Sequence, residues 1–195
     1  MSTSQSTTVS ESRPAGLTTR TMVFIAVMTA ITCLLAPLSI PIPISPVPIT
    51  LTNLVILISA CLLGWKFAAI SCLLYLLLGV AGLPVFSAYG FGIGKLIGPT
   101  GGYLVGFLPL AIGAGLIFEH VSHPLVQVIL LAAATLFLLY LPGTIWLAFQ
   151  AGLSFPEALM MGVIPYIPGD LVKIILSVVL GPTLVHSLKR AGVMQ

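Results

Sequence analysis

Residues 48–83 read PITLTNLVILISACLLGWKFAAISCLLYLLLGVAGL, and Lys66 is their one charged side chain. A helix needs roughly 20 apolar residues to cross a hydrocarbon core of about 30 Å. The two apolar runs, 48–64 and 67–83, each approach that length, and Trp65-Lys66 separates them. The stretch therefore predicts two membrane-spanning helices joined by a tight turn.

The rest of the chain has the same character. Of its 195 residues, 58% are hydrophobic and 6% are charged, a balance that water-soluble domains do not carry. Backbone groups in lipid are satisfied only in helices or closed barrels, and the alternating pattern of a barrel is absent. Further apolar runs lie near residues 22–38, 103–118, 125–149 and 169–186. We therefore expect an all-α integral membrane protein, a bundle of six transmembrane helices over residues 21–195 with long outer loops.

Charge orients this bundle. Residues 1–20 are rich in Ser and Thr and have no apolar core, which predicts a disordered cytoplasmic tail and not a signal peptide. Six spans put both termini on one side of the membrane. If that side is the cytoplasm, Lys95 alone lies in an outer loop, as the positive-inside rule predicts, since Lys173 falls inside the last run. The inward-facing basic residues are then Arg13, Arg20, Lys66, Lys189 and Arg190.

The outer connections are long and rich in Gly or Pro, whereas the inner turns are short. The outer connections cover residues 39–47, 84–102 and 151–168. Loops of this kind on a rigid scaffold commonly carry binding residues, so we expect binding or gating on the outer side. Four prolines between residues 41 and 48 exclude a helix there and predict a stiff loop. Gly162 and Pro165 interrupt residues 157–166, which predicts a short non-spanning helix or a re-entrant lid.

The sequence PGDLVK at residues 168–173 opens the last apolar run. Pro and Gly suit a helix start, and residues three apart lie on one helix face, so Asp170 and Lys173 point the same way. Ionisable groups at membrane depth cost roughly 3 kcal/mol each and usually face a protein interior or a water-filled cavity. The pair is therefore the leading candidate for a binding site. The alternative is a structural ion pair that satisfies itself at the positive end of the helix.

A second polar cluster, Thr50, Thr52 and Asn53, lies just inside the outer end of the second span. Asn53 is the most costly of the three to bury. It either joins a binding cavity or forms a hydrogen bond with another helix, and the sequence favours neither interpretation.

A third cluster is the glycine-rich outer loop that contains Ser87, Tyr89 and Tyr103. Glycines let backbone amides approach a ligand closely, and tyrosines offer flat apolar faces with polar tips. This combination suits a small planar ligand. A flexible loop with aromatic anchors at the membrane interface is the alternative.

Other kinds of chemistry are poorly represented. The three histidines have no cluster of carboxylates or cysteines beside them, so we expect no metal site and no cofactor. The chain has four acidic residues and no GxSxG or HExxH signature, so we expect no enzyme. It has no Walker loop, and energy from nucleotide hydrolysis would have to come from a separate subunit. Ala26 and Ala30 in the first span form a small-xxx-small pattern that lets another helix, from this chain or a partner, approach closely.

Four ordered motifs together resemble the BioY family, the biotin-specific S components of energy-coupling factor transporters. They are PVPITL at 46–51, GLPVF at 82–86, GPTGGYLVGF at 98–107 and IPGDLVK at 167–173, and the resemblance runs from about Thr21 to the C-terminus. It implies a compact six-helix fold that holds biotin near the outer face under loop closure. The family usually continues the first motif with Gln, whereas this chain has Thr52 followed by Asn53.

The resemblance also implies residue roles and partners. Asp170 and Lys173 match the family positions that contact biotin, and Ala26 and Ala30 match its docking face. The chemistry of these two residues is compatible with biotin. Asp170 can accept hydrogen bonds from the ureido N–H groups or orient Lys173, and the ammonium of Lys173 can pair with the biotin carboxylate. The implied partners are the lipid bilayer of a bacterial cell membrane, a membrane T component and two ATPases, with no nucleic acid. An S component for another vitamin and a solitary ATP-independent facilitator stay as alternatives.

Overall fold

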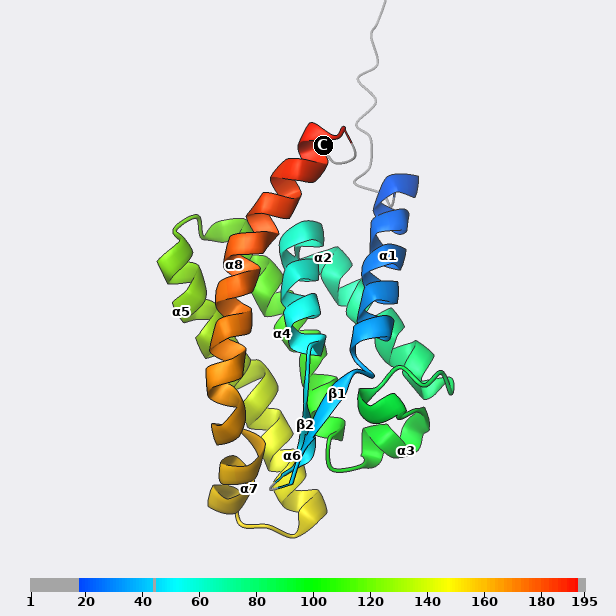
Figure 1. Cartoon of the computed structure of the whole chain (residues 1–195), viewed down its shortest axis with the longest axis vertical. Helices are drawn as coiled ribbons and strands as arrows, with labels where there is room; N and C mark the ends of the chain where they lie inside the picture. The colour runs from blue at the N-terminus through cyan, green and yellow to red at the C-terminus, as the bar shows by residue number, and fades with distance from the viewer. Residues whose placement is uncertain (1–17, 44, 193–195) are drawn as a thin grey trace, which may run out of the picture.

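Helices dominate the computed structural model, which describes residues 18–43 and 45–192 (Figure 1). The helical elements are α1 (Thr19–Leu35), α2 (Thr52–Val80), η1 (Ser87–Tyr89), α3 (Gly92–Ile97), α4 (Gly101–His120), α5 (Pro124–Ala134), η2 (Thr135–Tyr140), α6 (Leu141–Ala151), α7 (Phe155–Gly162), η3 (Ile164–Tyr166) and α8 (Ile167–Arg190). Most of the predicted tail, residues 1–17, lies outside the described residues. Thr18 caps α1 by accepting a hydrogen bond from the Thr21 amide, so the first helix begins slightly before residue 21.

The described chain has the helices of a multi-pass membrane protein. Four helical stretches are long and apolar enough to cross a bilayer: α2, α4, residues 124–151 and residues 155–190, with α1 as a shorter apolar helix. Their outward faces are apolar too, as in Leu34, Phe137 and Phe149, which are 72%, 68% and 82% exposed. Helices that are apolar all round suit a lipid environment. This confirms the prediction of a mainly helical membrane protein.

The turn predicted at Trp65-Lys66 is a reversal within α2. The backbone at Gly64 leaves helical geometry, with φ 73° and ψ 172°. Thr52 and Tyr75 line the same cavity, whereas a straight helix would separate them by about 35 Å. The two apolar runs of the opening stretch are therefore two limbs that fold back on one another (Figure 1). Glu119 of α4 holds the turn, because its Oε1 accepts a hydrogen bond from the Trp65 amide at 3.0 Å.

The core lies where α2 packs around α4. Leu57, Leu110 and Leu131 are fully buried there, and Leu147 of α6 joins them. A buried polar contact joins two of the helices: the hydroxyls of Thr29 on α1 and Ser71 on α2 are 3.0 Å apart. Hydrogen bonds of this kind connect helices in a medium that offers no other partner.

The proline-rich stretch is a β-hairpin and not a loop. Strands β1 (Ser39–Ile42) and β2 (Ser45–Thr50) pair antiparallel, with Ser39 opposite Thr50. The register shifts between Ile40 and Ile42, at a proline, which has no N–H to donate to a ladder. The prediction of a non-helical segment is confirmed, whereas its description as a loop is wrong. A two-stranded ribbon tolerates prolines because one edge of each strand is free.

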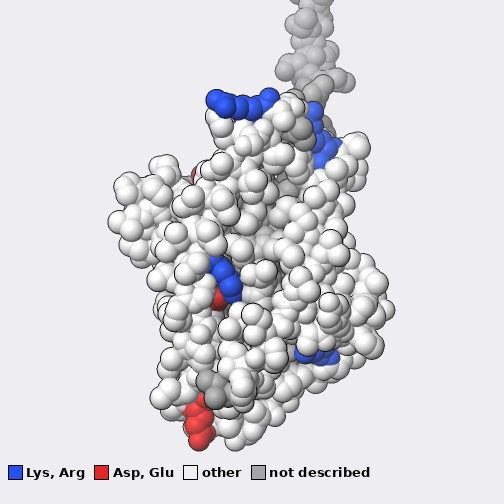
Figure 2. Space-filling model, viewed as in Figure 1, with Lys and Arg blue, Asp and Glu red and all other residues white. Residues whose placement is uncertain are grey.

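The hairpin, α3 and α7 lie at the end of the molecule opposite the start of α1 and the end of α8 (Figure 1). The segment predicted as a short helix or lid is α7 followed by η3, separated at Val163, which has non-helical dihedrals. Ser154 and Glu157 form a capping box at its start. Lys and Arg side chains gather at the end where α1 begins and α8 ends (Figure 2).

Candidate functional site

A divided cavity lies between the hairpin and the helices behind it. One lobe, of about 60 Å³, is lined by Asn53, Tyr140, Tyr166, Asp170 and Lys173, and we call it the ionic lobe. The other, of about 50 Å³, is lined by Thr52, Tyr75, Ser87 and Thr100, and we call it the hydroxyl lobe. Five residues line both lobes: Val47, Pro48, Thr50, Tyr103 and Phe107. The shared residues make the two lobes parts of one site.

Lys173 is the centre of the ionic lobe. Its Nζ donates to the Thr50 carbonyl at 2.7 Å, to Asn53 Oδ1 at 3.1 Å and to Asp170 Oδ1 at 2.9 Å. A lysine ammonium has three N–H donors, so each of them has a partner. Lys173 thereby joins the start of α8 to the end of β2 and the start of α2. The pair is more than an intrahelical ion pair, because it connects three elements around a cavity.

Asp170 carries the negative charge of this lobe. Its side chain is 9% exposed and that of Lys173 is 12% exposed. The Tyr140 hydroxyl donates to Asp170 Oδ2 at 2.5 Å, and the first turn of α8 contributes its positive helix end. Buried charges persist only with such partners. A small blue and red patch between α8 and the hairpin shows where charged atoms reach the surface on this face (Figure 2).

Tyr140 is a site residue that reasoning from the sequence missed. The residue lies within a long apolar run, where a tyrosine is ordinarily a packing residue or an interfacial anchor. Tyr140 ends a π-helical turn, residues 135–140, and its hydroxyl reaches Asp170 of α8. The available signal was the pair of polar groups, Thr135 and Tyr140, in an otherwise apolar segment.

Tyr166 is a second residue that the sequence did not identify. Its hydroxyl lies 2.8 Å from Ser45 Oγ and is also hydrogen-bonded to the Val47 carbonyl. These contacts fasten the hairpin to η3, just before the start of α8. Tyr166 also lines the ionic lobe. The hairpin therefore covers the site, and Tyr166 holds it in place.

Most of the predicted binding residues meet at this cavity. Asn53, Asp170 and Lys173 line the ionic lobe, and Thr52 and Ser87 line the hydroxyl lobe. For Asn53 the sequence left two interpretations, a place in a binding cavity or a hydrogen bond to another helix. Both hold in the structure, since Asn53 lines the cavity and accepts a hydrogen bond from Lys173.

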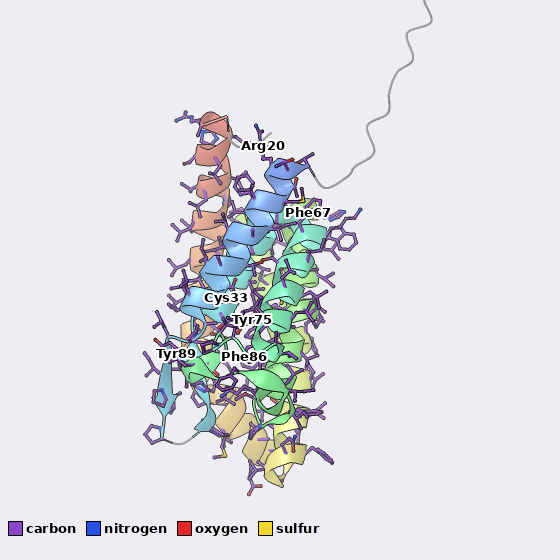
Figure 3. All side chains as sticks on the ribbon, turned by 90° about the vertical axis from the view of Figure 1, so that its right-hand side faces the viewer. Arg20, Cys33, Phe67, Tyr75, Phe86 and Tyr89 are labelled. Atoms are coloured by element: carbon purple, nitrogen blue, oxygen red, sulfur yellow. The ribbon has the colours of Figure 1, made fainter. Side chains whose placement is uncertain are left out.

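Tyr103 separates the two lobes. Its hydroxyl donates to the Gly162 carbonyl at 3.1 Å, and its ring packs edge-on against that of Tyr140 at 6.2 Å. Behind the hydroxyl lobe, the rings of Tyr75 and Phe86 meet edge-on at 5.6 Å, inside the molecule (Figure 3).

Tyr89 lies apart from the other predicted residues. It is 61% exposed and lines neither lobe, toward the surface of the molecule in Figure 3. Tyr89 and Ala88 have φ of 57° and 56°, a left-handed conformation that side chains seldom adopt. The Ala88 amide donates to Ser39 Oγ at 2.9 Å, so the strained turn is attached to the start of the hairpin.

Ala26 and Ala30 are exposed on α1, which lies at the surface of the bundle (Figure 3). The opposite face of this helix is buried through Ile25, Met28 and Thr29. The small-residue face is thus exposed in the described part of the chain. Within residues 18–43 and 45–192, no three His, Cys, Asp or Glu side chains group as they would around a metal ion.

Comparisons with known proteins agree on one family. The sequence matches the BioY family over residues 5–190. It is 33% identical over 171 residues to the biotin transporter BioY2 of Lactococcus lactis, covering 88% of this chain and 93% of that protein. It is 35% identical over 160 residues to a probable biotin transporter BioY of Pyrococcus horikoshii, covering 82% and 93%.

A solved structure shares the fold. The crystal structure of an S-component for biotin from an ECF-type ABC transporter superposes with a TM-score of 0.80 at 31% sequence identity. The match covers 87% of this chain and 94% of that one.

Proposed function

The chain belongs to the BioY family, and on that premise we propose that it captures biotin at the outer face of a cell membrane for uptake. In this proposal it is the substrate-binding component of an energy-coupling factor transporter and has no catalytic role. The observation that carries the proposal is the ionic lobe. A largely buried Asp170–Lys173 pair, hydrogen-bonded to its neighbours, faces a cavity near the hairpin end of a membrane bundle.

The chemistry of biotin suits this lobe. Its ureido ring presents two N–H donors and one carbonyl acceptor. Asp170 uses one lone pair of each oxygen, toward Lys173 and Tyr140, and keeps others to accept N–H groups. The oxygen of Asn53 faces Lys173, which can only donate, so its NH₂ group is turned elsewhere and can donate to a carbonyl.

Binding requires the cover to move. The two lobes, of about 60 and 50 Å³, are each well below the roughly 300 Å³ at which ligand pockets begin. We propose that the β1–β2 hairpin lifts to admit biotin and closes over it. Tyr166 fixes the closed position through Ser45 and Val47.

We place the protein with its termini in the cytoplasm and the cavity near the outer surface. The six spans are α1, the two limbs of α2, α4, the continuous 124–151 and α8, and the residues before α1 stay a predicted cytoplasmic tail. Basic side chains at the end of α8 and the start of α1 support this orientation. The exposed Ala26 and Ala30 then form the surface for a membrane T component, which works with ATPase subunits.

Uptake of radiolabelled biotin tests this proposal. Cells that lack their own biotin transport would express the chain with or without the T component and ATPases, with thiamine and riboflavin as control substrates. We expect biotin uptake that needs the added subunits. Equal uptake without them would favour the solitary facilitator, and uptake of a control vitamin in place of biotin would favour another S component.

A further inference from the structure

A groove lies beside the start of α1, at the end of the molecule opposite the hairpin. Its volume is about 310 Å³, larger than either lobe of the candidate site and within the range of ligand pockets, which begins at roughly 300 Å³. Arg20 of α1 and Phe67 of α2 both line the groove, and both lie at this end of the bundle (Figure 3). Biotin capture makes no use of this groove.

The polar side of the groove offers hydrogen-bond donors to an anion. Arg20 carries a positive charge and five N–H donors. In the part of the chain that the structure describes, no Asp or Glu forms an ion pair with Arg20 or lines the groove. The hydroxyls of Thr18 and Thr21 also line it and lie 2.8 Å apart. One hydroxyl hydrogen makes that bond, so the other is left for a ligand oxygen.

The other side of the groove is apolar. Phe24 lies one turn deeper than Arg20 on the same side of α1, about 6 Å along the helix axis. Leu62 and Leu63 end the first limb of α2, and Phe67 begins the second. A free inorganic anion would leave these four apolar side chains without a partner. A ligand with an anionic head and a hydrocarbon tail matches both sides.

The membrane itself supplies such a ligand. The groove opens beside α1, which lies at the surface of the bundle (Figure 3). Basic pockets between transmembrane helices on the cytoplasmic side bind anionic phospholipid headgroups. The first turn of α1 contains no acidic residue, so its positive helix end adds to the attraction.

We propose that an anionic phospholipid binds this groove, with its phosphate at Arg20 and the first part of an acyl chain against Phe24 and Phe67. Its place in the cytoplasmic leaflet rests on the proposed orientation of the chain. The groove is separate from the surface formed by Ala26 and Ala30, because positions 24 and 26 lie about 200° apart around a helix. The lipid can therefore stay bound while that surface contacts another helix, and it connects the start of α1 to the turn of α2.

Native mass spectrometry of the purified full chain tests this inference, with phosphatidylglycerol and phosphatidylcholine that carry the same acyl chains. One basic group near an anionic lipid surface contributes about fivefold in affinity, so we expect the parent to prefer phosphatidylglycerol by about that factor. Arg20→Gln should reduce the preference to less than about twofold. Arg190→Gln is the matched control, because it removes the same charge from the end of α8, outside the groove, and should keep the preference.

Phe24→Ala examines the apolar side. We expect it to weaken both lipids by similar factors, because their acyl chains are the same, and we expect inorganic phosphate not to displace either lipid. Four results would overturn the inference: no preference in the parent, equal losses of preference in Arg20→Gln and Arg190→Gln, unchanged lipid binding in Phe24→Ala, or displacement by phosphate. The first of these would leave the groove to a protein segment. Thermal unfolding shows that each variant is folded, so the result is independent of whether the chain binds biotin.

Discussion

Joint replacement of the buried ion pair separates a binding site from a structural contact. Lys173→Gln alone removes the positive charge beside Asp170, whose side chain is 9% exposed. Breaking a buried pair in this way costs about 3–5 kcal/mol of stability, because one charge is left unpaired. Asp170→Asn together with Lys173→Gln removes both charges, so we expect much of that stability to return.

Binding should follow a different pattern. Both variants lack the ammonium that orders Thr50, Asn53 and Asp170, and the double variant also lacks the carboxylate that accepts N–H groups. Two hydrogen bonds to charged groups contribute about 1.5–3 kcal/mol each, which predicts biotin binding at least about a hundredfold weaker in the double variant.

Thermal unfolding in detergent measures the first effect, and isothermal titration calorimetry with biotin measures the second. Lys189→Gln is the matched control, since it removes the same charge from the exposed far end of α8 and should bind as the parent chain does. A double variant that is stable and binds biotin within about threefold of the parent would show that the pair is only structural.

Three further outcomes follow from the geometry. Tyr140→Phe removes the donor to Asp170 and should weaken biotin about tenfold in the same titration, and an unchanged affinity would exclude Tyr140 from the site. Gly64→Ala should destabilise the chain by more than about 1 kcal/mol in thermal unfolding, because φ is +73° and the new Cβ would lie 2.4 Å from a carboxylate oxygen of α4. An unchanged unfolding midpoint would contradict the reversal at this glycine. Ala26→Leu with Ala30→Leu should leave biotin binding intact and abolish ATP-dependent uptake, whereas normal uptake would place the docking surface elsewhere.

The sequence predicts the membrane helices well, because the solvent imposes a strong pattern. A run of apolar residues without charges has few structures open to it in lipid. The tight turn after residue 64 is visible as Trp65-Lys66, although its sharpness depends on Gly64 and on Glu119, which is distant in sequence. The sequence did not predict the hairpin, because the prolines that exclude a helix are also unusual in strands.

The sequence identifies those residues of the candidate site that are unusual within a membrane helix. Asp170 and Lys173 stand out because charge at membrane depth is costly, and their spacing alone puts them on one face. Tyr140 does not stand out, and its position depends on a π-helical turn that no local pattern announces. Tyr89, which sits in a suggestive loop, lies outside both lobes because the turn directs it to the surface.

Equilibrium binding of biotin to the purified chain in detergent tests the central claim most directly. With thiamine and riboflavin as controls, we expect biotin to bind more tightly than micromolar and the controls not to compete. Biotin binding no tighter than micromolar, or equal binding of a control vitamin, would contradict the account.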